Sequence, residues 1–201
     1  MKLIAVRNSQ RSVPDWLCLL WITLSFLTTQ VSLTQSLSET FVAKPEIRHA
    51  GIVDVTFGKN VKVVQPVNLY GCTIGDETFV GPFVEIQKGV NIGKRCRIQS
   101  HSFICELVTI GDDCFISHGA MFINDPFVAG GPAEKPDLWR ATRVGNHVSV
   151  GTNATVLPVT ICDQVVIGAG AVVTKDIAIS GIYAGNPARL LRRLPAAATT
   201  D

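Results

Sequence analysis

Aliphatic residues recur at every sixth position through the middle of the chain, without any change of register. The series consists of Ile74, Val80, Ile86, Ile92, Ile98, Ile104, Ile110, Ile116 and Phe122. A helix repeats every ~3.6 residues and a strand every second residue, so neither element alone produces this period. A fixed short period indicates one structural unit that is repeated, with each copy stacking on the last to complete the core.

Small or β-branched residues stand two positions before each aliphatic residue, and glycine often follows it directly. The preceding residues are Cys72, Thr78, Val84, Val90, Cys96, Ser102, Val108, Cys114 and Ala120. Residues two apart in a strand face the same side, so both positions point inward. Glycine supplies the backbone angles of the bend. The pattern therefore predicts an all-β protein in which the chain winds as a parallel coil of short strands and turns.

The series stops after Phe122 and resumes at Val144, Val150 and Val156. The intervening residues 124–142 are rich in glycine and proline, and they carry Trp139. Long loops in compact domains are more often functional than not, although a tolerated surface loop would look the same. We therefore expect residues 124–142 to project from the coil and to contribute to a substrate site.

The two ends of the chain differ from the repeat. The apolar run "WLCLLWITLSFL" follows several basic residues, but it is shorter than the ~20 residues that cross a membrane. Residues 1–45 are expected to be an N-terminal extension: a signal, a membrane anchor, or the product of a start codon placed too far upstream, with the last two favoured. Residues 46–185 are expected to form the repeat domain, and residues 186–201 a short C-terminal helix and a tail.

Composition limits the classes of function. The chain has 201 residues, which suggests one domain or at most two, and its net charge of +2 gives no reason to expect nucleic acid as a partner. The cysteines include no CxxC pair that would suggest zinc, so no metal is expected. Inward-facing cysteines act as small apolar side chains.

Several segments resemble the hexapeptide-repeat acyltransferases over about residues 46 to 193: "IGDETFVGPFVEIQKGVNIG", "VTIGDDCFI", "VGTNATVLP", "VVIGAGAVVTKDI" and "YAGNPARLLRRL". The resemblance implies a three-sided left-handed β-helix with about eighteen residues per coil, a homotrimer, and sites for acetyl-CoA and an acceptor between subunits. The chain departs from relatives at "LPVTIC", where a glycine is missing and Cys162 stands in a glycine position. Leu107 likewise replaces the glycine of "CEGV".

With eighteen residues per coil, residues eighteen apart stack in columns spaced by ~4.8 Å. One corner then carries Lys88, Glu106 and Asn124, and another carries Pro82, Ser100 and His118 beside Phe83, His101 and Gly119. Beyond the loop, Thr152 and Asn153 continue the second corner. These two corners hold the densest group of chemically capable side chains, although exposed corners also accept polar residues that have no function.

The segment "IQSHSFICELVTIGDDCFISHGAMFIND" is most similar to sugar-nucleotide N-acetyltransferases of 3-amino-deoxyhexoses or amino-uronates. The resemblance implies that His101, Glu106 and Asn124 are catalytic, and we expect His118, Lys88 and Trp139 to bind the substrate. An amine needs less activation than a hydroxyl, and His101 is suited to accept its proton. Galactoside O-acetyltransferases carry a histidine in "YTATHP", whereas the corresponding "FINDPF" has none, which argues against an alcohol acceptor.

The resemblance also implies where acetyl-CoA binds. The pantetheine arm is expected along "GTNAT" and "GAGAV", and the phosphates near two basic residues. The expected contacts are Thr152, Asn153, Ala154, Gly168, Ala169, Gly170, Ala171, Lys175 and Arg189. Simple turn geometry also accounts for the glycines.

The main hypothesis is a cytoplasmic, acetyl-CoA-dependent N-acetyltransferase of a nucleotide-linked amino sugar, used for surface polysaccharide. Membrane association is expected only if the N-terminal segment is an anchor. The alternatives are a sugar O-acetyltransferase, a γ-class carbonic anhydrase, and a non-catalytic β-helix scaffold. A zinc site of the carbonic anhydrase type needs three converging histidines, and His147 falls on a different column from His101 and His118.

Overall fold

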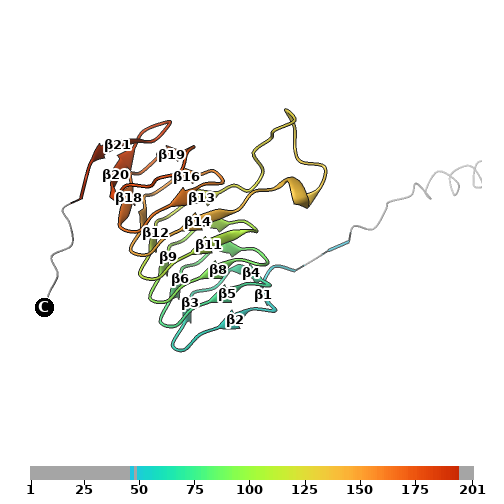
Figure 1. Ribbon diagram of the computed structural model, residues 1–201. Helices are drawn as coiled ribbons and strands as arrows, with labels where there is room; N and C mark the ends of the chain where they lie inside the picture. Colours follow the sequence, from blue (N-terminus) through green and yellow to red (C-terminus); the bar gives the residue numbers. More distant parts are fainter. Residues whose placement is uncertain (1–45, 48, 195–201) are drawn as a thin grey trace, which may run out of the picture. The chain divides into compact units, whose positions relative to one another are not determined.

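The structure is a computed structural model that describes residues 46–47 and 49–194. The described residues from His49 onward form one compact unit, which winds as a left-handed β-helix whose three sides are built from parallel strands (Figure 1). The predicted fold class is confirmed. The expectations for residues 1–45 lie outside the described residues, and their boundary with the repeat stays a prediction.

Each coil contributes short strands to sheets A, B and C in turn, except that the last coil adds no strand to sheet B. Sheet A contains β1 (Ile52–Val53), β4 (Asn68–Tyr70), β7 (Glu85–Ile86), β10 (Phe103–Ile104), β13 (Met121–Phe122), β16 (Thr155–Val156) and β19 (Val172–Val173). Sheet B contains β2 (Thr56–Phe57), β5 (Thr73–Ile74), β8 (Asn91–Ile92), β11 (Val108–Ile110), β14 (Thr142–Val144) and β17 (Thr160–Ile161). Sheet C contains β3 (Lys62–Val63), β6 (Phe79–Val80), β9 (Arg97–Ile98), β12 (Phe115–Ile116), β15 (Ser149–Val150), β18 (Val165–Ile167), β20 (Gly181–Ala184) and β21 (Arg189–Arg192).

The aliphatic residues of the six-residue series form the core. Ile86 pairs with Ile104 in sheet A, and Ile98 pairs with Ile116 in sheet C, so each side chain lies directly on the one before it. Both pairs are fully buried, as is Phe122, where the coil meets the projecting loop. Burial of a Leu- or Ile-sized side chain stabilises a fold by roughly 1.5–3 kcal/mol, so the repeated series is the main source of stability.

Three corners join the sheets, and we name them by their side chains. The charged corner joins sheet B to sheet C, the histidine corner joins C to A, and the loop corner joins A to B. Most turns carry a residue with positive φ, for example Glu77, His101 and Leu107. Leu107 has φ 70° and is exposed, and this conformation costs a residue with a Cβ about 1–2 kcal/mol. The glycine of relatives would be unstrained at this position.

The shortened repeat lies at the loop corner, near the end of sheet B. Leu157 and Pro158 make the turn between β16 and β17, and Val159 fills the inward position. A Cβ on Gly145 would come within 2.7 Å of the backbone of the next coil. Cys162 takes the equivalent place one coil later, but only an isolated bridge from Ile161 to Ile177 follows there. The side chain of Cys162 is therefore accommodated.

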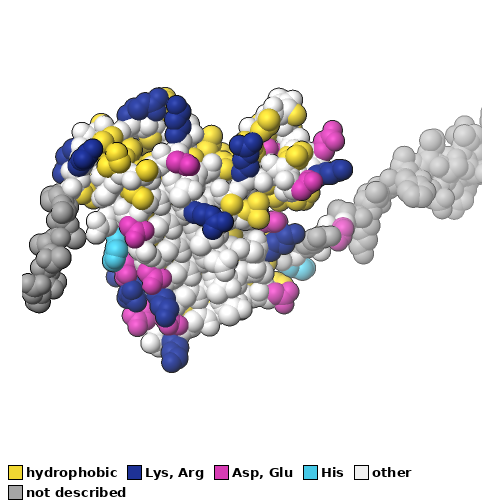
Figure 2. All heavy atoms as spheres, in the orientation of Figure 1, with side chains coloured by type: hydrophobic (Ala, Val, Ile, Leu, Met, Phe, Trp, Pro, Cys, Tyr) yellow, Lys and Arg dark blue, Asp and Glu magenta, His cyan; other side chains and the backbone are white. Residues whose placement is uncertain are grey.

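The charged corner is held together by bonds from one coil to the next. The carboxylates of Asp76, Asp112 and Asp163 accept hydrogen bonds of 2.8 Å from backbone N–H groups one coil earlier. Arg95 donates two bonds of 2.7 Å to the carboxylate of Asp113, which holds the pKa of that carboxyl below its ordinary value. Figure 2 shows the resulting stripe of alternating charges along one edge of the β-helix.

The predicted C-terminal helix is wrong for the residues that the structure describes. Arg189–Arg192 form β21, which pairs antiparallel with β20 at the end of sheet C (Figure 1). Helix propensity in "RLLRRL" is a weak preference, and the free edge of β20 offers a row of backbone partners instead. Tyr183 pairs with Leu190 in this hairpin.

Residues 123–141 leave the coil between β13 and β14 as a projecting loop, which holds the short 3-10 helix η1 (Pro136–Leu138) (Figure 1). The backbone N–H of Arg140 donates to the carbonyl of Asn124 at 2.8 Å, which closes the base of the loop. Within residues 46–47 and 49–194, no helix is long and apolar enough to cross a bilayer.

Candidate active site

His101 projects from the histidine corner, between β9 and β10. Its backbone has φ 63°, and its N–H donates to the carbonyl of Pro82 at 3.2 Å, so the turn fixes where the side chain starts. The imidazole stacks on the ring of Phe83 with centroids 4.9 Å apart and an angle of 29° between the planes. Both side chains are exposed, so the ring is oriented by stacking and remains open to a substrate.

His118 and Asn153 lie on the coils that follow His101. Nδ1 of His118 is 2.7 Å from the hydroxyl of Ser100, one coil earlier. The backbone N–H of Asn153 donates to the carbonyl of His118 at 2.9 Å. A Cβ on Gly119 would collide with the amide oxygen of Asn153, so this glycine leaves room for the amide in the column above His101. The predicted grouping of these residues at one corner is what the structure shows.

Glu106 and Asn124 lie at the loop corner, where the projecting loop begins. Nδ2 of Asn124 donates to the carbonyl of Glu106 at 3.4 Å, and Lys88 forms an ion pair of 3.6 Å with the carboxylate of Glu106. The amide oxygen of Gln87 accepts a 3.3 Å bond from the backbone N–H of Glu106. Sequence reasoning missed Gln87, although it directly precedes Lys88.

Tyr70 lies on the outer side of sheet A, close enough to the carboxylates of Glu85 and Glu106 to feel their charge. Burial raises the pKa of the Tyr70 phenol, and the negative charges of Glu85 and Glu106 raise it further. The phenol is therefore held in its neutral form, in which it can donate a hydrogen bond. Burial also raises the pKa of the Cys105 thiol to about 12, so this neighbouring thiol is not a nucleophile near neutral pH.

The projecting loop encloses a cavity of about 720 Å³. Its lining includes Asp125, Val128, Glu134, Leu138 and Arg140. The carboxylate of Asp125 accepts bonds from the backbone N–H groups of Phe127 at 2.9 Å and Ala133 at 2.7 Å, which shapes the loop around the cavity.

Trp139, which was expected to contact the substrate, ends η1 and is half-buried. The cavity is lined by its neighbours Leu138 and Arg140 rather than by its own side chain.

The three residues expected to be catalytic do not meet at one corner of a single chain. Strand β10 and the width of sheet A separate His101 from Glu106 and Asn124. Sequence columns place residues along the axis of the coil, but they do not bring two corners together. No single corner of the chain therefore supplies all three residues.

The expected cofactor segments stack at the C-terminal end of the histidine corner. The backbone N–H of Gly170 donates to the carbonyl of Thr152 at 2.8 Å, which places "GAGAV" directly on "GTNAT". The methyl groups of Ala154 and Ala171 point into the core and are fully buried. These two side chains therefore cannot contact a cofactor, whereas the side chains of Thr152, Asn153 and Ala169 are exposed and, with the backbone, remain available.

Lys175 and Arg189 line one cavity of about 280 Å³, although they come from different parts of the chain. The turn that follows β20 brings Arg189 back beside Lys175, so the expected pair of basic residues lies together at this end. Tyr183 lines the same cavity and donates its hydroxyl hydrogen to the carbonyl of Ile179 at 2.8 Å. Sequence reasoning missed Tyr183, although it opens the quoted segment "YAGNPAR".

The histidines do not converge on a metal. His101 and His118 lie at the histidine corner, whereas His147 is exposed at the charged corner beside Asp113 and Asp163. In the described part of the chain, no group of three or more His, Cys, Asp or Glu residues is arranged to hold a metal ion.

Two stretches match known repeat families. Residues 71–106 match the model of the bacterial transferase hexapeptide (six repeats), and residues 141–175 match the hexapeptide repeat of succinyl-transferase. Both matched stretches lie within the β-helix, so these coils are similar to the hexapeptide repeats of bacterial transferases.

Three proteins illustrate the similarity. The bifunctional protein GlmU of Clostridium beijerinckii is 34% identical over 140 residues, which cover 65% of this chain and 30% of GlmU. The galactoside O-acetyltransferase of Escherichia coli K12 is 32% identical over 133 residues, covering 61% and 64% of the two chains. A hexapeptide-repeat acetyltransferase of Vibrio cholerae, solved with acetyl-CoA, is 25% identical, with a TM-score of 0.53 and coverage of 63% and 72%. This chain therefore spans less than two thirds of both curated relatives.

Proposed function

We propose that this protein is an acetyl-CoA-dependent N-acetyltransferase that acts on a nucleotide-linked amino sugar. The observation that carries the proposal is the histidine corner, where His101 is exposed and oriented beside the coil from which the loop departs. Relatives and structural neighbours that are acetyltransferases support acetyl transfer, and the acetyl-CoA bound to the Vibrio cholerae protein supports the co-substrate.

The reaction follows from the side chains at this corner. The neutral amine of the sugar attacks the thioester carbonyl, a C–N bond forms, and the C–S bond breaks. His101 accepts the proton that the amine loses, because imidazole exchanges protons readily near neutral pH. The departing thiolate of coenzyme A takes up a proton, so the overall change releases free coenzyme A and an acetamido sugar.

Glu106 and Asn124 hold the acceptor in this scheme. The carboxylate of Glu106 accepts hydrogen bonds from sugar hydroxyls or from the amine, and Lys88 balances its charge. The amide of Asn124 lies at the base of the loop, so it links acceptor binding to the loop and its cavity. Lys175 and Arg189 pair with the phosphates of coenzyme A at the far end of the coil.

A homotrimer completes the site in this proposal. One protomer supplies the histidine corner and the next supplies the loop corner, since the two corners lie on opposite edges of sheet A. Mixing two impaired variants at acceptor concentrations well below KM tests this arrangement, because both variants are slow under that condition. Trimers reassembled from His101→Ala and Asn124→Ala protomers should exceed the mean activity of the two parents, since about a quarter of their sites then combine two intact corners. A mixture whose activity is only the mean of its two parents contradicts the shared site.

An O-acetyltransferase is the second candidate, because the galactoside O-acetyltransferase of Escherichia coli is among the relatives. The absence of a histidine in "FINDPF" favours the amine.

The deciding experiment incubates the full chain with acetyl-CoA and a panel of nucleotide-linked amino sugars, and follows coenzyme A release. Mass spectrometry after mild alkali should show an acetyl group that persists. Loss of that group identifies an ester and overturns N-acetylation, whereas no release with any sugar overturns the proposed function.

A further inference from the structure

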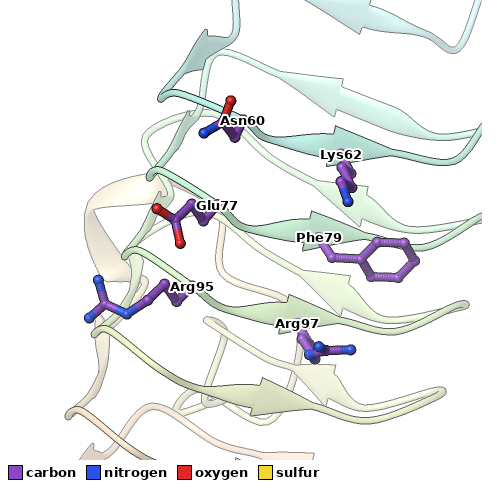
Figure 3. Close-up of a pocket in the computed structure, with 6 residues that line it drawn as sticks. All are labelled: Asn60, Lys62, Glu77, Phe79, Arg95 and Arg97. Carbon is purple, nitrogen blue, oxygen red and sulfur yellow. The ribbon is translucent and has the colours of Figure 1, made fainter.

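A groove of about 440 Å³ crosses the outer face of sheet C, on the coil of His101 and the two coils before it. It is lined by Asn60, Lys62, Glu77, Phe79, Arg95 and Arg97 (Figure 3). Lys62, Phe79 and Arg97 occupy one column, because Lys62 pairs with Phe79 and Phe79 with Arg97 in neighbouring strands. Adjacent strands are ~4.8 Å apart, so an aromatic ring lies between two cations that are separated by about 10 Å at the backbone.

The charges in this groove are of two kinds. Arg95 is neutralised by Asp113 at the charged corner, where Glu77 also lies (Figure 3). Lys62 and Arg97 form no ion pair with any residue of the described chain, and both are exposed. The groove therefore offers two free cations on either side of Phe79, while the acidic side chain stays at the corner.

Sheet B provides an internal comparison. In the three coils that carry the groove, its outward positions hold Thr56, Thr73 and Asn91, which are small and uncharged. The geometry of the two faces is the same, so the repeat itself does not require cations or an aromatic residue there. Because the fold does not require Lys62, Phe79 and Arg97 at these positions, the three residues indicate a site that binds a ligand.

We propose that Lys62, Phe79 and Arg97 bind the nucleoside diphosphate part of the acceptor. Lysine and arginine pair with phosphate oxygens, and the face of an aromatic ring stacks on a nucleobase. The proposal rests on the proposed function, since it takes the acceptor to be nucleotide-linked. It assigns the nucleotide to sheet C and leaves the sugar for the histidine corner.

The position of the groove suits this division. Arg97 and His101 lie on the same coil with three residues between them, so their backbones are at most about 14 Å apart. Gln99 and Ser100 form the path between them, and neither is bulky or charged. A diphosphate held at Arg97 therefore extends along sheet C toward His101, where the sugar amine meets the thioester.

Binding of nucleotides in the absence of acetyl-CoA tests the site independently of catalysis. Isothermal titration of the full chain with UDP, dTDP, GDP, CDP and inorganic pyrophosphate measures each affinity. Lys62→Ala and Arg97→Ala should each weaken both pyrophosphate and the preferred nucleotide by about tenfold, as expected for the loss of a charge-assisted contact. Arg143→Ala is the matched control, because it removes an exposed cation from sheet B and should change neither affinity.

Phe79→Leu separates the base from the phosphates. Leucine keeps the groove covered but removes the ring, so nucleotide affinity should fall at least about fivefold while pyrophosphate affinity is unchanged. Added salt should weaken pyrophosphate binding to the wild-type protein. Circular dichroism establishes that each variant is folded, which is expected because all three side chains lie on the outer face of the sheet.

Four results overturn the proposal. The wild-type protein fails to bind pyrophosphate and every nucleotide, or the double variant Lys62→Ala/Arg97→Ala binds them as well as the wild type. In the third, Lys62→Ala or Phe79→Leu changes the oligomeric state, which identifies the groove as a contact between copies of the chain. If acetyl transfer to nucleotide-linked sugars proceeds normally in the double variant, this site is wrong and the proposed function stands. If nucleotides bind through Lys62 and Arg97 but no amino sugar is acetylated, the enzyme assignment fails instead.

Discussion

The charged corner and the histidine corner have the same backbone but use their side chains differently. His147 and His101 occupy equivalent turn positions with φ 55° and 63°. At the charged corner, Asp76 and Asp112 bind backbone N–H groups of the preceding coil, so their side chains serve the frame. At the histidine corner, no described side chain makes such a bond, and the residues contact one another or remain exposed.

The contrast distinguishes polar side chains that stabilise the β-helix from polar side chains that are available for function. Carboxylates that bind the backbone of the preceding coil stabilise the fold and are not available to a ligand. Exposed side chains that make no such bond to the backbone, such as His101, remain available for chemistry. The positive φ at both corners belongs to the fold, so it carries no information about function by itself.

Removing a core residue should destabilise the charged corner and the histidine corner alike, because both corners of a coil pack on the same aliphatic side chain. Ile98 is fully buried between Arg95 at one corner and His101 at the other. Ile98→Ala should lower the free energy of unfolding by about 3 kcal/mol, and Ile98→Val by about 1 kcal/mol. Urea titration measures both values. A loss under about 1 kcal/mol for the alanine variant would show that the aliphatic series is not the main source of stability.

Residues of the loop corner should affect binding more than turnover. Asn124→Ala and Glu106→Ala each remove hydrogen bonds to the acceptor, so KM for the acceptor should rise by about tenfold with kcat changed less than about threefold. Steady-state kinetics with varied acceptor measures both constants. Thr109→Ala on the outer face of sheet B is the control. A large fall in kcat at unchanged KM would place these residues in the chemical step.

Acid should weaken the charged corner first. Arg95 holds the pKa of Asp113 below its ordinary value, so this carboxylate stabilises the fold above that ordinary value, ~3.9, and the contribution is lost as pH falls through the folded pKa. Asp76 and Asp163 act in the same direction. Tm should therefore fall between about pH 5 and pH 2, and Asp113→Asn should flatten that fall.

Calorimetry over this pH range follows the change, with Glu134→Gln in the loop as the control. An identical acid profile for Asp113→Asn and the wild type would show that the Arg95–Asp113 pair contributes nothing.

The smallest effect is expected at Leu107, whose positive φ the repeat imposes. Leu107→Gly relieves the strain of a Cβ at φ 70° but loses a half-exposed apolar side chain and makes the unfolded chain more flexible. These contributions offset one another, so the free energy of unfolding should change by less than about 1 kcal/mol. Leu107→Val, with a branched Cβ at the same φ, should be the less stable of the two variants. Equal stability of the two variants would show that backbone strain at position 107 does not determine the free energy of unfolding.

The core and the corner columns could be predicted from the sequence because the period is regular. Ile74 to Phe122 keep one register, and the stacking of Ser100 with His118 follows directly from it. The C-terminal strand could not be predicted, because "RLLRRL" becomes a strand only through the free edge of β20. The repeat places Ala154 and Ala171 at inward positions, where both are buried. Because they lie in glycine-rich segments, they were predicted to contact the cofactor instead.

The groove on sheet C was hidden by unequal coil lengths. Lys62 and Phe79 are 17 residues apart, whereas Phe79 and Arg97 are 18 apart, so a fixed spacing does not align all three. The separation of His101 from Glu106 and Asn124 was visible in the columns. The shared site that we propose depends on assembly, which the repeat of one chain does not reveal.

The central claim is that the histidine corner performs chemistry while the charged corner supports the frame, and the pH dependence of turnover in two histidine variants tests it most directly. His101→Ala should lower turnover at neutral pH by at least about 100-fold, with a smaller effect at alkaline pH, where the amine is already neutral. His147→Ala, at the equivalent turn position, should change turnover by less than about twofold. The account is contradicted if the pH profiles of His101→Ala and the wild type run parallel with turnover changed less than about tenfold, or if His147→Ala abolishes activity in a folded protein.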